Sequence, residues 1–176
     1  MTRYIALLRG VNVGGITIRS ADLRALFDEL GFDEVRTVLA SGNVVFTATD
    51  DAASADPKQR IEQALRDRFG YDAWIVLVTR KQVERVIEAF PFDASDAARQ
   101  PWVVFGSDDA VLDDLVASAG EPDPQVDPIA RGEGVVYWNP VKGTTVQTPF
   151  AKLLAKPRYK PTTTNRNLRT LQKLLV

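Results

Sequence analysis

The order of apolar runs and amphipathic stretches in the first 79 residues constrains the fold of this chain most strongly. Four runs have the length and apolar character of strands, at residues 4–9, 35–39, 44–46 and 73–78. Two stretches between them repeat apolar residues at helical spacing, at residues 21–30 and 57–69. The resulting β-α-β-β-α-β order predicts a ferredoxin-like unit over residues 1–79.

Capping residues set the predicted limits of the helices. Ser20, Thr79, Ser107 and Thr164 each precede a helical stretch and are predicted to cap it, while Pro57 takes the first helical position of its own stretch. Gly31 and Gly70 follow helical stretches and are predicted to end them.

Residues 80–176 predict a second, degenerate copy of the same unit. A helix over 80–90 and a connector over 93–100 lead to a strand at 102–105 and an acidic helix at 107–119. A hairpin follows, with strands at 128–131 and 135–138, then helices from 148 to 154 and from 164 onward. We therefore expect an α+β protein with antiparallel sheets, two ferredoxin-like repeats and an added C-terminal helix. The predicted domains are 1–79 and 80–176, or one compact body, although the halves show no sequence identity.

The composition excludes several kinds of catalytic and metal-binding site. The chain has no cysteine and no histidine, which excludes thiol nucleophiles, Ser-His-Asp triads and zinc sites built from Cys and His. Its net charge of −1 argues against nucleic acid as a partner. With no apolar run of membrane-spanning length and no secretory signal, a cytoplasmic location is expected. No metal, cofactor or oligomeric state is indicated.

A glycine-rich stretch follows the first predicted strand. Arg9 stands where the strand ends, and the loop contributes Gly10, Asn12, Gly14 and Gly15. Exposed backbone N–H groups in such a loop can hold an anion, and an arginine adds charge. The alternative is a conformationally demanding strand-to-helix connection that binds nothing. Ser41 and Asn43, in a predicted turn, are further candidates, although asparagine in a turn commonly satisfies only the backbone.

Charge is spread unevenly along the second half. Residues 107–133 hold eight acids and one arginine, whereas Lys142–Val176 holds eight Lys and Arg residues and no acid. This asymmetry favours an anionic ligand at the C-terminal end, with Lys152 among the candidate residues. The alternative is a solvated basic face that packs on the acidic segment of the same chain.

The predicted last helix adds further candidates. With Thr164 as its cap, Arg166 and Asn167 fall in a first turn that usually carries acidic residues. A helix start with an arginine is a plausible seat for a phosphate or carboxylate. Alternatively, Arg166 pairs with a carboxylate elsewhere. If Arg9 and Arg166 serve one anion, the two residues must share a site.

Three motifs carry a family resemblance. Residues 7–15, residues 41–46 (Ser-Gly-Asn-Val-Val-Phe) and residues 164–171 resemble the domain of unknown function 1697 family, in the expected order and over nearly the whole chain. The resemblance implies a bacterial cytoplasmic α+β protein with ferredoxin-like repeats and no established activity. The family's C-terminal motif usually reads Thr-x-Arg-Asn-Trp-Asn-Thr, and this chain has Leu168 and Arg169 in place of the tryptophan and the second asparagine.

Three functional hypotheses remain. The leading one is a binding module for a small anionic or phosphorylated ligand such as a nucleotide. The second is an enzyme on a phosphorylated substrate, with magnesium. The third is RNA binding, for which the central strands offer only Tyr4 and Phe46 as stacking aromatics. A structural or oligomeric role is a further alternative.

Overall fold

The computed structural model describes residues 1–9, 16–39, 42–50 and 56–176. Its contacts divide the chain into two compact units: unit 1 comprises Met1–Val83 and Lys173–Val176, and unit 2 comprises Glu84–Gln172. None of the helices within the described ranges has the length and apolar character needed to cross a membrane.

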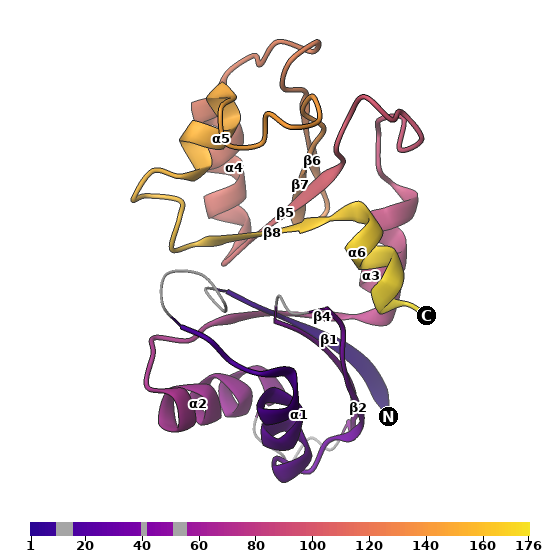
Figure 1. The fold of residues 1–176 in the computed structure, drawn as a ribbon, viewed down its shortest axis with the longest axis vertical. Helices are drawn as coiled ribbons and strands as arrows, with labels where there is room; N and C mark the ends of the chain where they lie inside the picture. The colour runs from indigo at the N-terminus through magenta and orange to yellow at the C-terminus, as the bar shows by residue number, and fades with distance from the viewer. Residues whose placement is uncertain (10–15, 40–41, 51–55) are drawn as a thin grey trace. The chain divides into compact units, whose positions relative to one another are not determined.

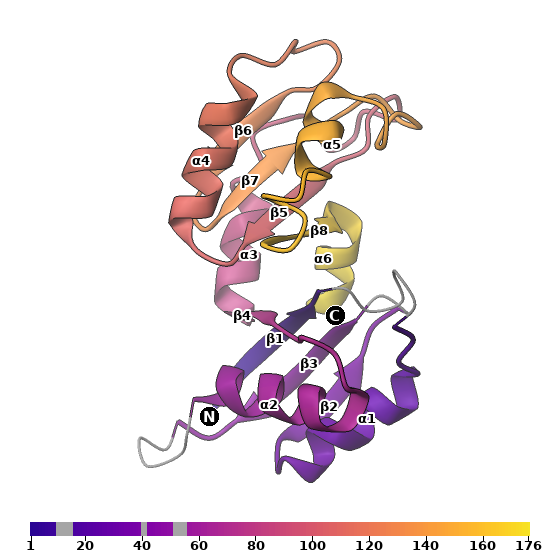
Figure 2. The ribbon, with the colours of Figure 1, turned by 90° about the vertical axis from the view of Figure 1, so that its left-hand side faces the viewer.

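Unit 1 contains one four-stranded antiparallel sheet. Its elements are β1 (Thr2–Leu8), α1 (Ser20–Glu29), β2 (Asp33–Thr37), β3 (Asn43–Ala48), α2 (Pro57–Phe69) and β4 (Ile75–Thr79). The strands lie in the order β2-β3-β1-β4. Both helices cover the same face of this sheet (Figures 1 and 2). The β-α-β-β-α-β order predicted from the sequence is therefore present.

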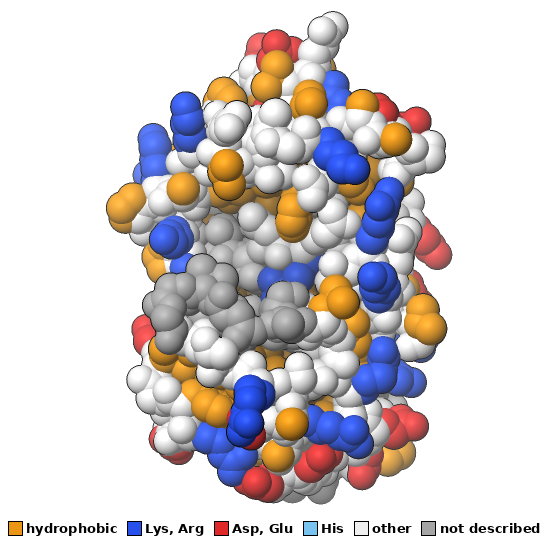
Figure 3. Space-filling view, viewed as in Figure 1, with side chains coloured by type: hydrophobic (Ala, Val, Ile, Leu, Met, Phe, Trp, Pro, Cys, Tyr) orange, Lys and Arg blue, Asp and Glu red, His pale blue; other side chains and the backbone are white. Residues whose placement is uncertain are grey.

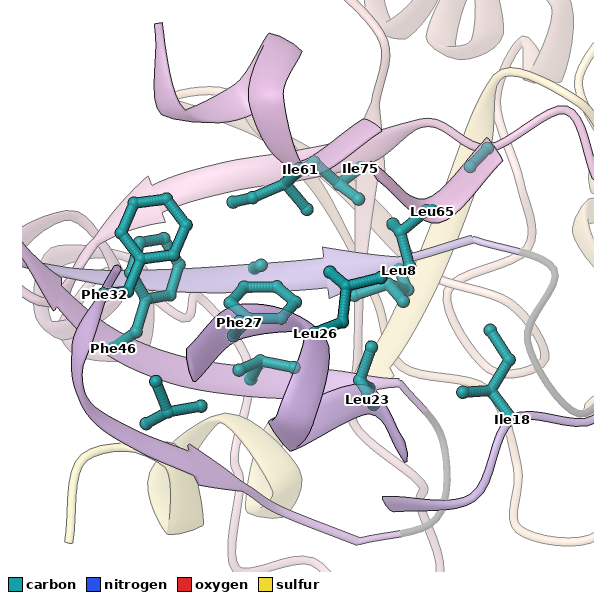
Figure 4. Packing of buried hydrophobic residues seen from close by; sticks show 14 of the residues in the cluster. Leu8, Ile18, Leu23, Leu26, Phe27, Phe32, Phe46, Ile61, Leu65 and Ile75 are labelled. Atoms are coloured by element: carbon teal, nitrogen blue, oxygen red, sulfur yellow. The ribbon is translucent and has the colours of Figure 1, made fainter. Parts of the chain in front are cut away.

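The core of unit 1 lies between this sheet and its two helices. Leu26 and Phe27 of α1 and Leu65 of α2 are buried against Leu8 and Phe46 of the sheet (Figure 4). The ring of Phe27 meets the ring of Phe46 edge-on at 5.3 Å between centroids. This is the apolar face that the helical spacing of the sequence predicts.

Unit 2 repeats the arrangement. Its elements are β5 (Trp102–Gly106), α4 (Asp109–Ala119), β6 (Ile129–Gly132), β7 (Val135–Trp138), α5 (Pro149–Leu154) and β8 (Thr163–Asn167). The strand order β6-β7-β5-β8 is the same as in unit 1, and all pairs are antiparallel. The α+β fold with antiparallel sheets is confirmed, and both units have the β-α-β-β-α-β order predicted for ferredoxin-like repeats. The second repeat keeps all six elements, but α5 has 6 residues where α2 has 13.

Strand register matches the two repeats residue by residue. Tyr4 on β1 lies opposite Phe46 on β3 and Thr79 on β4. In the second repeat Trp102 on β5 lies opposite Trp138 on β7 and Asn167 on β8. Tyr4 and Trp102 both pack against the helix-covered core of their own unit. The preceding residue on β4 is Val78, and the preceding residue on β8 is Arg166. Arg166 therefore occupies the position that Val78 has in the first repeat.

A seventh element completes each repeat. Helix α3 (Arg80–Glu88) follows β4 directly, and α6 (Leu168–Leu174) follows β8 directly. In unit 2 the hydroxyl of Tyr137 donates to the carbonyl of Val86 at 2.7 Å. In unit 1 the Nη2 of Arg36 donates to the carbonyl of Leu174 at 3.3 Å. Val86 and Leu174 are each the seventh residue of their helix, whereas their partners come from different strands of the repeat, β7 for Tyr137 and β2 for Arg36. Each unit thus contains a segment from the other half of the chain.

Two predicted helix caps are wrong, and one is confirmed. Arg19 is the cap position of α1 and makes no capping hydrogen bond, because a guanidinium has no acceptor atom; it instead donates to the Asp22 carboxylate at 2.9 Å. Helix α4 is capped by Asp108, which accepts from the N–H of Val111 at 2.8 Å, rather than by Ser107. Thr79 does cap α3, accepting from the N–H of Gln82 at 3.2 Å.

The start of the last helix is also predicted wrongly. Thr163–Asn167 form strand β8, which pairs with β5 over its whole length, and the helix begins at Leu168. Asn167 performs the capping, since its Oδ1 accepts from the N–H of Arg169 at 2.9 Å. The extended backbone of residues 163–167 forms strand hydrogen bonds with β5. This pairing joins residues far apart in the sequence, so the spacing of apolar residues around Arg166 does not predict it. Arg166 therefore does not lie in a helix start.

Each unit contains residues from both sides of residue 95. We therefore predict that the two parts of the chain stay together after the chain is cut there. Cleavage at a protease site inserted after Ser95, beyond α3, should leave the two fragments associated at micromolar concentration. Val86 of α3 lies in unit 2 and is 8% exposed, and its carbonyl accepts from Tyr137. The fragment that ends at residue 95 therefore carries part of unit 2, and the buried contacts of that part resist separation. Size-exclusion chromatography after cleavage measures this. Elution of two separate fragments, each folded by circular dichroism, would contradict the prediction.

Candidate functional site

A pocket in unit 2 lies between the C-terminal end of α4, the loop that follows it and helix α5. It has a cavity volume of about 530 Å³, within the range of about 300–1,000 Å³ typical of small-molecule sites. Most of its lining is apolar, and the remainder consists of two aspartates, two lysines and a serine. The lining residues are Ser118, Ala119, Pro122, Asp123, Val126, Asp127, Pro149, Phe150, Lys152, Leu153 and Lys156.

The carboxylate of Asp127 fixes the wall of this pocket. Asp127 is 1% exposed. The indole Nε1 of Trp138 donates to its Oδ1, and the backbone N–H of Phe150 donates to its Oδ2 at 2.7 Å. Both oxygens are thus bonded to N–H donors from β7 and from the first turn of α5. This carboxylate positions the loop against the helix.

The second aspartate of the pocket is likewise used within the fold. The Oδ1 of Asp123 accepts from the N–H of Gln125 at 2.9 Å, an Asx turn. The carbonyl of Asp123 accepts from the N–H groups of Val126 and Asp127 at 3.0 and 2.8 Å. These bonds hold residues 123–127 in a compact turn.

The two lysines of the pocket stand one helical turn apart. Lys152 was a candidate from the sequence, and Lys156 was not; its i+4 spacing from Lys152 is the signal that could have identified it. Both side chains are exposed. In the described part of the chain neither ammonium group has an ion pair. The neighbouring Arg158, by contrast, pairs with Asp114 at 2.9 Å, so the acidic segment neutralises only part of the basic one.

The predicted residues of β8 lie apart from the lining of this pocket. Arg166 is 7% exposed. Its Nη1 donates to the Oγ1 of Thr164 at 2.7 Å and to the carbonyl of Asn165 at 2.9 Å. Burial lowers the pKa of Arg166 to about 10, which leaves the guanidinium charged at neutral pH. Because Val78 occupies the matching position of the first repeat, the strand itself does not require a charge there.

The remaining predicted residues belong to unit 1. The N–H of Arg9 donates to the carbonyl of Trp74 at 3.4 Å, beyond the end of β1. Asn43 is 1% exposed, and its Nδ2 donates to the carbonyl of Val38 at 3.0 Å, which closes the turn between β2 and β3. The other candidates of this unit lie outside the described residues; they are Gly10, Asn12, Gly14, Gly15 and Ser41. A site shared by Arg9 and Arg166 stays a prediction.

The aromatic pair considered for RNA stacking is part of the core. Tyr4 and Phe46 stack at 5.7 Å between ring centroids, and Phe46 is fully buried beneath the helices. The Phe46 ring therefore cannot receive a base, whereas Tyr4 is partly buried. On the face shown in Figure 3, Lys and Arg side chains stand apart from one another rather than forming one continuous basic surface.

The hydrogen bonds of Arg166 predict that its guanidinium supports strand β8. Removing one partner of a buried hydrogen bond leaves the other unsatisfied, at a cost of ~1–3 kcal/mol. Arg166→Met should therefore lower the free energy of unfolding by ~1–3 kcal/mol at pH 7, measured by urea denaturation, because the Oγ1 of Thr164 and the carbonyl of Asn165 lose their donor. The control Arg169→Met, at an exposed position of α6, should stay within ~0.5 kcal/mol of the parent protein. An unchanged or raised free energy of unfolding in Arg166→Met would contradict this role.

The two hydrogen bonds of Asp127 predict a second effect. Asn has one acceptor oxygen and cannot receive both N–H donors, so Asp127→Asn should lower the free energy of unfolding by ~1–3 kcal/mol. In Asp123→Asn the amide oxygen can still accept from Gln125, and this control should change stability little. Equal denaturation midpoints for the two variants would contradict the role assigned to Asp127.

Comparisons with known proteins agree with this architecture. A comparison with curated protein sequences gives no match. Among solved structures, the chain is similar to the conserved bacterial protein SP0830 from Streptococcus pneumoniae, with a TM-score of 0.80 and 26% sequence identity over 98% of this chain and 96% of that one. The family model described as "Protein of unknown function (DUF1697)" matches residues 1–137. The first two sequence motifs lie within the matched residues, and the third, at 164–171, lies outside them. The chain therefore belongs to the DUF1697 family, as the sequence predicts.

Proposed function

We propose that this protein is a binding module for a small anionic or phosphorylated ligand that carries an apolar ring, and that the pocket of unit 2 is its site. One observation carries the proposal. The two carboxylates of the pocket are engaged by N–H donors of the fold, whereas Lys152 and Lys156 have no ion pair among the described residues. The two lysines and two aspartates of the lining balance in formal charge, and the hydrogen-bond donors that the fold leaves for a ligand are the two ammonium groups.

The rest of the lining defines the other half of the ligand. Apolar groups of Pro122, Val126 and Leu153 line the same cavity as the lysines. An aromatic ring that loses ~150–200 Å² of exposed surface there would gain ~4–5 kcal/mol. Each exposed lysine adds ~0.2–1 kcal/mol. These terms give dissociation constants on the order of 10 µM to 1 mM. Apolar burial supplies most of the affinity, and the lysines select for negative charge.

Nucleotides and aromatic acids both combine a ring with an anion, and they form the test panel. Thermal-shift and calorimetric titrations with inorganic phosphate, mononucleotides and small aromatic carboxylates should find compounds that stabilise the protein. At a concentration of about 100 times the dissociation constant, the stabilisation should reach ~2.7 kcal/mol. The ring-bearing anions should bind more tightly than phosphate alone, because phosphate buries no apolar surface.

A pair of lysine variants locates the binding. Lys152→Ala combined with Lys156→Ala should weaken binding at least severalfold, while Lys142→Ala, an exposed lysine of the same unit outside the pocket, should bind as the parent protein does. If no compound of the panel binds, or if the double variant binds as tightly as the Lys142→Ala control, the proposal is wrong.

A further inference from the structure

A buried tyrosine connects helix α4 to the segment that follows α5. Tyr159 is 3% exposed. Its hydroxyl lies 2.6 Å from the Oδ2 of Asp114 and 2.7 Å from the Oγ of Ser118, residues one turn apart on α4. Ser118 is exposed and belongs to the lining of the unit 2 pocket. The tyrosine therefore joins a carboxylate to a hydroxyl at the pocket.

The chemistry of the three groups fixes the direction of both hydrogen bonds. Asp114 pairs with the guanidinium of Arg158 at 2.9 Å, and an ionised carboxylate only accepts hydrogen bonds. The Tyr159 hydroxyl has one proton, which it donates to Asp114. The phenolic oxygen then accepts, so the hydroxyl of Ser118 donates to Tyr159. The single proton of Ser118 is committed, and its oxygen has only lone pairs left to offer.

We propose that Ser118 acts as a hydrogen-bond acceptor for the ligand and makes the pocket select anions that also carry an N–H or O–H donor. This inference rests on the proposed function and narrows its ligand class. A ligand with an acceptor facing Ser118 would meet lone pairs and lose its bond to water without replacement. A bound ligand that covers Ser118 takes water away from its oxygen, so a ligand without a donor leaves that oxygen unpaired and binds more weakly.

Two isosteric acids test the proposal. Indole-3-acetate has an N–H donor, and 1-benzofuran-3-acetate has a ring oxygen at the same position with nearly the same shape and charge. Calorimetric titration of the full chain should show indole-3-acetate binding about tenfold more tightly, the ratio that corresponds to one hydrogen bond. In Ser118→Ala the ratio should fall to about one, whereas Ser107→Ala, an exposed serine of the same unit outside the pocket, should keep the ratio of the parent protein.

Tyr159→Phe supplies an independent readout. This change removes the acceptor for the Ser118 proton, which can then turn toward the ligand, so benzofuran-3-acetate should gain affinity relative to the parent protein. Circular dichroism checks that each variant is folded; should Tyr159→Phe not fold, the Ser118→Ala ratio decides. Equal binding of the two acids to the parent protein, or an unchanged ratio in Ser118→Ala, overturns the role of Ser118 and leaves the anion site standing if the lysine double variant still weakens binding. Binding of neither acid overturns both proposals.

Discussion

The central strands of both sheets bury side chains on both faces, and the remaining elements follow from that requirement. Ile5, Ala6, Leu7 and Leu8 of β1 are at most 2% exposed, as are Val103, Val104 and Phe105 of β5. Alternate residues of a strand point to opposite faces, so a helical layer on one face is not sufficient. In unit 2, Trp138 packs on the side of α5, and Tyr137 points the other way to bond the carbonyl of Val86 on α3. In unit 2, α3 therefore contributes to this second face.

The two repeats differ at the position of Arg166 and in the helix beside the pocket. Val78 on β4 corresponds to Arg166 on β8, a buried cation that the strand does not require. The 13-residue helix α2 corresponds to the 6-residue helix α5, beside which the pocket lies. The pocket therefore lies beside the element in which the second repeat is shorter than the first.

The sequence predicts the fold well because local signals and long-range pairing agree over most of the chain. Strand β8 is the exception: Leu168 and Leu171 mark the helix correctly, but the helix start depends on Asn167 as cap and on pairing with β5, a contact between residues about 60 apart. The pocket could not be predicted for a similar reason. Its walls come from residues 118–127 and 149–156, which are separate in the sequence. The hydrogen bonds that Asp127 accepts from Trp138 and Phe150 form only when the fold brings these residues together.

The central claim is that anions bind at the pocket of unit 2, and the location of binding tests it most directly. In ¹⁵N-labelled protein titrated with indole-3-acetate or inorganic phosphate, amide chemical-shift changes would report where each anion sits. The account predicts that changes cluster at residues 118–127 and 149–156, the lining of the pocket. Changes that cluster instead around Arg9 and the glycine-rich stretch after it, with the pocket amides unmoved, would contradict it.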